Sequence, residues 1–139
     1  MTNIYLIENK ITSIKKNLKI LKGFRKHSIE ALRDEITLHG AVKWYLYLVL
    51  QDSIYLAEAV ISFKDFRKPT SYSENFEILH EEKFISSELK EKLAKMTGFR
   101  NLVIHEYGKL NFEKINHILH NNLKDIENFA EQIKLKLKI

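Results

Sequence analysis

The stretch "NIYLIENKITSIKKNLKILK", residues 3–22, carries the clearest periodic signal in the sequence. Its apolar residues recur at steps of three and four, the spacing that places side chains on one face of an α-helix. These residues are Ile4, Ile7, Ile11, Ile14, Leu18 and Leu21. Most of the residues between them are polar, so the opposite face suits water. We therefore predict an amphipathic helix over 3–22 that Gly23 ends with a left-handed cap.

The next part of the chain continues the helical pattern. Ser28 is placed to cap a turn or short helix, and residues 36–64 predict one long helix that is apolar on most sides and therefore central. After the single proline, Ser71 and Glu74 have the spacing of a capping box. This spacing predicts a short helix over about 72–82.

Two further helices are expected in the C-terminal half. Ser86 or Ser87 caps a helix that runs toward Tyr107 and stops at Gly108, and Asn111 caps the last helix. Four glycines and one proline in 139 residues favour long helices with few turns. We predict an all-α, up-and-down bundle of about five helices that forms one domain over residues 1–139.

The composition restricts the function only broadly. The 23 Lys and Arg residues against 18 Asp and Glu give a net charge of +5, which weakly favours an anionic partner and also suits solvated helix faces. The absence of cysteine excludes disulfides, thiolate metal sites and a cysteine nucleophile. No secretion signal is seen, and the longest apolar run, residues 44–50, is too short to span a membrane. We expect a cytoplasmic protein with no membrane contact.

The stretch "FRNLVIHEYGKL", residues 99–110, breaks the apolar stripe of its own helix. Arg100 and, seven residues later, Tyr107 lie on the stripe, whereas His105 points about 140° away from Arg100 on an ideal helix. The apolar members of the stripe are Leu89, Leu93, Met96 and Val103. A lone buried guanidinium is costly, so Arg100 should meet a carboxylate, a polar cleft or another chain.

The segment "FRNLVIHEY" resembles the Arg, Asn, three residues, His, any residue, Tyr signature of the HepT-like branch of the HEPN superfamily. That branch is the toxin half of toxin–antitoxin systems, paired with a minimal nucleotidyltransferase called MntA. The likeness covers about residues 28–133 and includes the segments "AVKWYLYLVLQDSIYLAEAVI", "KPTSYSENFEIL", "ISSELKEKLAKMTGFRN" and "YGKLNFEKINHIL" in the same order.

The resemblance implies a metal-independent endoribonuclease that acts as a homodimer and needs no cofactor. Its substrate would be RNA, with tRNA and mRNA both open. Arg100 would hold the phosphate and stabilise the transition state, His105 would act as general base or acid, and Asn101 would orient the phosphate or His105. The partner nucleotidyltransferase would transfer AMP to Tyr107. The resemblance does not decide whether the partner inhibits by AMP transfer or by steric binding. It also does not decide whether the site lies within one chain or spans the dimer.

Several alternatives are left open by the sequence. The chain could be a non-catalytic helical subunit that only binds a nucleotidyltransferase. His117 and His120 are three residues apart, but no third metal ligand is evident, so no metal site is expected. An aromatic run could stack bases, although helical spacing favours core packing. This run consists of Trp44, Tyr45, Tyr47 and Tyr55.

Overall fold

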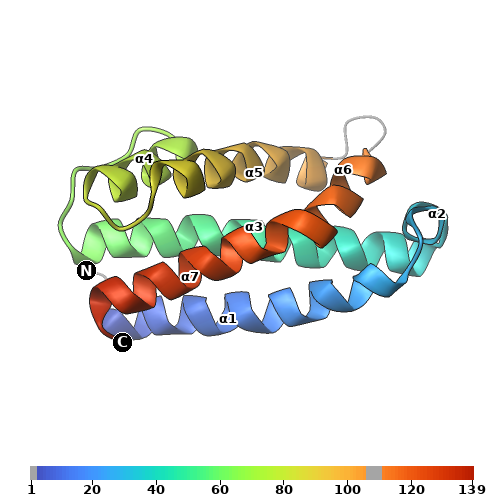
Figure 1. The fold of residues 1–139 in the computed structure, drawn as a ribbon, viewed down its shortest axis with the longest axis horizontal. Coiled ribbons are helices and arrows are strands. Elements are labelled where there is room, and N and C mark those ends of the chain that lie inside the picture. Colours follow the sequence, from blue (N-terminus) through green and yellow to red (C-terminus); the bar gives the residue numbers. More distant parts are fainter. Residues whose placement is uncertain (1–2, 106–110) are drawn as a thin grey trace.

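The computed structural model describes residues 3–105 and 111–139, and four long helices make up its body (Figure 1). These helices are α1 (Ile4–Gly23), α3 (Ile36–Phe63), α5 (Ser87–His105) and α7 (Leu123–Leu137). In Figure 1, α1 and α5 run in one direction along the bundle, and α3 and α7 run back. The predicted all-α up-and-down bundle is confirmed.

Shorter elements connect the long helices. They are η1 (Phe24–Lys26), α2 (Ile29–Asp34), α4 (Tyr72–Glu81), α6 (Phe112–His117) and η2, a π-helical turn (Ile118–Asn122). The segment before α4 returns along the bundle from the end of α3, and it brings the first turn of α4 next to α5 (Figure 1). This path of the chain places α4 beside the candidate site on α5.

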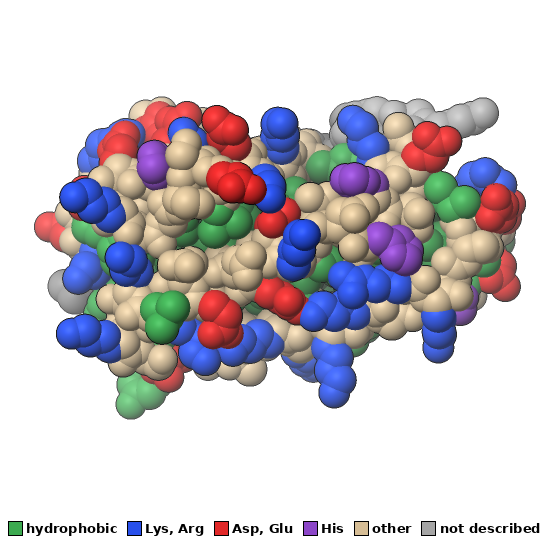
Figure 2. All heavy atoms as spheres, viewed as in Figure 1, with side chains coloured by type: hydrophobic (Ala, Val, Ile, Leu, Met, Phe, Trp, Pro, Cys, Tyr) green, Lys and Arg blue, Asp and Glu red, His purple; other side chains and the backbone are tan. Residues whose placement is uncertain are grey.

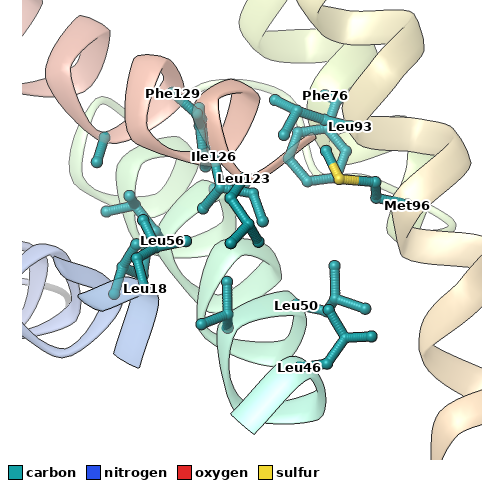
Figure 3. Close-up of a cluster of buried hydrophobic side chains, with 14 of the residues drawn as sticks. Leu18, Leu46, Leu50, Leu56, Phe76, Leu93, Met96, Leu123, Ile126 and Phe129 are labelled. Atoms are coloured by element: carbon teal, nitrogen blue, oxygen red, sulfur yellow. The ribbon is translucent and has the colours of Figure 1, made fainter. Parts of the chain in front are cut away.

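The core lies between α3 and the helices around it. α3 packs against α1, α2, α4 and α5, while α7 packs against α1 and α5. Figure 3 shows the interdigitated side chains in the middle of the bundle. The labelled ones are Leu18, Leu46, Leu50, Leu56, Phe76, Leu93, Met96, Leu123, Ile126 and Phe129. Phe76 of α4 and Phe129 of α7 meet edge to face, with ring centroids 5.7 Å apart.

The predicted capping residues bond to the first turns of their helices. Each side-chain oxygen accepts a backbone N–H two or three residues ahead, as N-caps do. The pairs are Ser28 with Ala31, Ser71 with Glu74, Ser86 with Leu89, and Asn111 with Glu113 and Lys114. The cap of α5 is therefore Ser86 and not Ser87. The carboxylate of Glu74 bonds Thr70, one residue before the expected partner Ser71.

The predicted left-handed cap at Gly23 is wrong. Gly23 has φ −62° and ψ −24°, and it continues the right-handed turn into η1. The backbone N–H of Phe24 bonds the carbonyls of Leu21 and Lys22. The carbonyls at the end of α1 are thus satisfied by a tightened 3₁₀ turn, which needs no residue with positive φ.

The last helix is not continuous, in contrast to the prediction. The π-helical turn η2 separates α6 from α7. Two side chains bond backbone carbonyls here: Asn121 Nδ2 donates to the His117 carbonyl at 3.1 Å, and Arg25 Nε donates to the Leu119 carbonyl at 2.6 Å. These donors compete with the regular helical hydrogen bonds, which favours a local change of pitch.

Helix α3 is long and apolar enough to cross a membrane by length and composition. Its most apolar 18-residue window has a mean hydropathy of 1.4, and 61% of that window is buried inside the bundle. A buried core helix meets the same criteria, and the helices packed around α3 explain its apolar surface without a membrane.

Candidate functional site

The C-terminal part of α5 carries the segment that breaks the apolar stripe. Four stripe residues are buried as predicted, and each is at most 8% exposed. They are Leu89, Leu93, Met96 and Val103. Arg100 lies between the last two along the chain and is partly buried. The guanidinium of Arg100 therefore lies at the junction of α5 with α3 and α4.

The contacts of Arg100 in the described residues are to neutral groups. Its Nη1 donates to Oε1 of Gln51 on α3 at 2.6 Å, and its guanidinium carbon lies 4.8 Å from the centre of the Tyr72 ring on α4. Nε is buried and has no hydrogen-bond partner among the described residues. Among the described residues, Arg100 therefore meets a polar and an aromatic side chain and no carboxylate. The amide and the ring fix the plane of the guanidinium while leaving its charge uncompensated by these two contacts.

Gln51 is the site residue that the sequence analysis missed. It is 7% exposed and lies 49 residues before Arg100 in the chain. The available signal was the polar group "QDS", residues 51–53, which interrupts the apolar residues of the central helix. Such an interruption in a buried helix indicates polar partners on neighbouring helices.

The segment that brings Tyr72 to Arg100 is held by a fork of ion pairs. Arg67 donates to Glu74 at 2.8 Å and to Glu81 at 2.7 Å. Hydrogen bonds from Thr70 and Arg67 lower the pKa of Glu74, so its carboxylate stays charged at neutral pH. These contacts tie the start of α4 to the preceding loop and fix where Tyr72 begins the helix.

The structure describes only the backbone of two of the other predicted site residues and nothing of the third. Asn101 and His105 belong to α5, which is helical as far as His105, but their side chains lie outside the described part of the structure. Arg100 and His105 are five residues apart on α5, which corresponds to about 7.5 Å along the axis of an ideal helix. Tyr107 lies outside the described residues.

A groove of about 660 Å³ lies between α5, α6 and η2, and Arg100 is not among its lining residues. Lys92, Lys95 and Lys114 line it together with Glu113. Lys92 pairs with Glu88 and Asp125, which reduces the net positive charge of the groove. Figure 2 shows Lys and Arg side chains spread over this side of the molecule among Asp and Glu. Several Lys and Arg side chains lie next to one another below the centre of this view, and the others are spread among acidic side chains as on solvated helix faces.

The remaining candidates have mixed outcomes. His117 Nδ1 accepts a hydrogen bond from Asn121 Nδ2 at 3.1 Å, and no three His, Asp or Glu side chains converge among the described side chains of residues 3–105 and 111–139. Tyr45 and Tyr47 pack against the core as expected. Core packing is wrong for Trp44 and Tyr55, which are 55% and 46% exposed. Both lie on α3, beside the face that holds Gln51.

Comparison with known proteins gives a family and a set of relatives. A family model described as ribonuclease HepT-like matches residues 14–133. A curated protein of Shewanella oneidensis, the mRNA nuclease HepT, is 28% identical over 129 residues, which are 93% of this chain and 96% of that protein.

Solved structures agree with this result. A tri-AMPylated Shewanella oneidensis HEPN toxin in complex with an MNT antitoxin aligns with a TM-score of 0.85 and 28% identity. The alignment covers 97% of this chain and 99% of the toxin. A cytosolic protein of unknown function from Bacillus subtilis aligns with a TM-score of 0.86 at 15% identity, over 99% of this chain and 92% of that one, and it shares the fold.

Proposed function

Since this chain belongs to the ribonuclease HepT-like family, we propose that it is a metal-independent endoribonuclease toxin of a two-gene system. We propose further that it acts in the cytoplasm as a homodimer and is neutralised by AMP transfer from a partner nucleotidyltransferase. Two relatives support this proposal: one is an mRNA nuclease, and another is an AMPylated toxin in complex with an antitoxin.

The observation that carries the proposal is the environment of Arg100. A guanidinium taken partly out of water normally pairs with a carboxylate, whereas this one contacts the amide of Gln51 and the ring of Tyr72. A pre-oriented cation that the described residues leave without a carboxylate partner suits an anionic ligand that arrives from outside, and phosphate matches the fork of donors on arginine.

His105 supplies the proton chemistry in this proposal. Cleavage of RNA without a metal requires removal of the proton from a ribose 2′-hydroxyl, attack of that oxygen on phosphorus, and protonation of the leaving 5′-oxygen. Imidazole exchanges protons near neutral pH and can serve as the base or the acid. Arg100 stabilises the extra negative charge on the phosphoryl oxygens, and Asn101 orients the phosphate or His105.

Two features support a homodimer with shared sites. Trp44 and Tyr55 are exposed, seven residues before and four residues after Gln51 on α3, and so flank the helix face that leads to Arg100. Exposed aromatic residues of this kind are enriched at protein interfaces. The 140° divergence of Arg100 and His105 also suits a two-fold axis that combines one residue from each protomer.

We expect RNA cleavage by the purified protein to persist in excess EDTA, because imidazole and guanidinium perform the chemistry. The measurement is gel analysis of total RNA incubated with the wild type, and with His105→Ala to exclude a contaminating nuclease. Loss of cleavage in EDTA that magnesium restores would overturn the metal-independent mechanism.

Replacement of Gln51 with leucine should slow cleavage about tenfold with little change in side-chain volume, because Arg100 loses the acceptor that orients it. The same substitution should cost nothing more in an Arg100→Ala background, since Gln51 acts through Arg100. The measurement is kcat in the four proteins of this cycle, with thermal melting of each as the control for folding. Equal losses in both backgrounds would assign Gln51 a role in stability alone.

A further inference from the structure

The positive charge of the chain is concentrated in one segment. Residues 9–29 hold seven of the 23 Lys and Arg residues and none of the 18 Asp and Glu residues. The rest of the chain has 16 Lys and Arg against 18 Asp and Glu, which is a net charge of −2. Solvated helix faces usually mix both signs of charge, whereas a block of one sign indicates a partner of the opposite sign.

The fold presents most of these cations on the C-terminal half of α1 and on η1. Lys15, Lys19 and Lys22 are four and three residues apart, which places them on one side of the helix, and Lys16 lies beside them. From Lys15 to Lys26 the surface extends about 16 Å along the axis. Figure 2 shows basic side chains next to one another over this half of α1. We call this surface the basic patch, and it consists of Lys15, Lys16, Lys19, Lys22, Arg25 and Lys26.

The described residues neutralise only part of the basic patch. Lys15 Nζ lies 2.9 Å from Glu131 Oε1, and Lys22 pairs with Glu127, both on α7. The other three lysines are exposed and form no ion pair with the described residues: Lys16, Lys19 and Lys26. Lysines three or four residues apart on a helix repel each other, so an anion bound between them relieves this repulsion.

Arg25 is held in place by a neutral group. Its Nε donates to the carbonyl of Leu119 at 2.6 Å, which fixes the guanidinium against η2. No carboxylate pairs with it among the described residues. The basic patch therefore ends in an oriented guanidinium whose charge is available to a phosphate group.

The chemistry of the basic patch fits a phosphate backbone better than a membrane or a protein. A helix that binds a bilayer exposes an apolar face, but no apolar side chain is exposed between Lys15 and Lys26. The apolar face of α1 is buried in the bundle, with Ile14 0% and Leu18 2% exposed. Lysine is depleted at protein–protein interfaces, whereas Lys and Arg without apolar neighbours are typical of phosphate contacts.

We propose that the basic patch binds the phosphate backbone of RNA at a distance from the cut. The proposal rests on the proposed ribonuclease function. α1 and α5 lie at opposite edges of the bundle in Figure 1, and α3 and α7 pack against both. The axes of packed helices are about 8–10 Å apart, so the patch is on the order of 15 Å from Arg100. Only an RNA long enough to cross the bundle contacts both places, and the patch therefore favours long RNA of any sequence.

The test compares three proteins. The patch variant carries three substitutions: Lys16→Gln, Lys19→Gln and Lys26→Gln. The control variant carries three at other exposed lysines that form no ion pair with the described residues: Lys64→Gln, Lys83→Gln and Lys136→Gln. Fluorescence anisotropy gives the Kd for uridine oligonucleotides of about 30 and about four residues, over salt from about 0.05 to 0.3 M, where phosphate contacts are salt-sensitive. The oligonucleotides are 2′-O-methylated, so no 2′-hydroxyl is available to attack.

We expect the wild type and the control variant to bind the long oligonucleotide more tightly than the short one, with a steeper salt dependence. Each contact to a single strand contributes about 0.7 to the slope of log K against log salt, so the patch variant should lose about 2 from the slope. Its affinity for the long oligonucleotide should fall about tenfold or more near 0.15 M salt. An unchanged slope in a patch variant that melts like the wild type, or an equal loss in the control variant, would overturn the proposal. A wild type that binds phosphatidylserine vesicles and no RNA would assign the patch to membranes and overturn it as well.

A footprint of the wild type decides if the patch variant does not fold. Lysine acetylation read by mass spectrometry should show that the long oligonucleotide protects Lys16, Lys19 and Lys26 and leaves Lys64 and Lys83 reactive. Equal reactivity with and without RNA refutes the patch. These measurements do not depend on cleavage, so a wild type that binds RNA through the patch and cuts none would overturn the nuclease function and leave the patch supported.

Discussion

Replacement of Arg100 with alanine should reduce RNA cleavage by about 10²-fold or more, the usual loss when one charge-stabilising donor is removed from a transition state. Gln51 and Tyr72 already orient the guanidinium, so little free energy is lost in ordering it when substrate binds. The measurement is the single-turnover rate on a defined RNA. Arg33→Ala, which removes an exposed arginine on α2, is the matched control and should retain full activity. An Arg100→Ala protein that is folded and fully active would contradict the proposed role.

Mixing experiments show whether the site spans two chains. If each cleft takes Arg100 from one protomer and His105 from its partner, a heterodimer of Arg100→Ala with His105→Ala regains one intact site. Complete exchange of equal amounts should then restore about a quarter of wild-type activity, because half of the dimers are mixed and each has one working site. No recovery after verified exchange, or a monomer by light scattering, would contradict the shared site.

Tyr107→Phe should escape neutralisation by the partner nucleotidyltransferase and should keep much of the nuclease activity. In the proposed transfer, the phenol oxygen attacks the α-phosphorus of ATP and pyrophosphate leaves. Each attached AMP adds a phosphodiester charge, which competes with substrate for Arg100, and bulk, which blocks the cleft. The solved structure of a tri-AMPylated relative in complex with its antitoxin motivates this prediction.

Intact-mass spectrometry after co-expression with the cognate nucleotidyltransferase checks the modification, and cell growth checks the escape. We expect a gain of whole AMP units that disappears in Tyr107→Phe. Tyr5→Phe, at a tyrosine that is 73% exposed, serves as the control and should be modified like the wild type. An unmodified complex that is fully inhibited would assign control to steric binding.

The helices were predictable because their signals are local. Apolar spacing of three and four sets the buried face of α1, and side-chain oxygens at Ser28, Ser71 and Asn111 bond N–H groups no more than three residues away. The break in the last helix, which was predicted to be continuous, depends on a distant contact. The π-helical turn involves Arg25, which is 94 residues from its acceptor on Leu119.

In the candidate site, too, local signals were readable from the sequence and distant contacts were not. Arg100 was visible in the sequence because a charged residue on an apolar stripe contradicts the pattern around it. Its partner Gln51 was signalled only by the polar group at residues 51–53, which does not reveal that the partner helix is α5.

The end groups of the RNA fragments test the central claim most directly. In the proposed mechanism the 2′-oxygen attacks phosphorus, so every cut leaves a 2′,3′-cyclic phosphate on one fragment and a 5′-hydroxyl on the other. Mass spectrometry of a short RNA cleaved by the purified protein in EDTA reads both ends. The account predicts these two termini with the wild type and no cleavage with His105→Ala. A 3′-hydroxyl paired with a 5′-phosphate would show that water is the nucleophile and would contradict the roles given to Arg100 and His105.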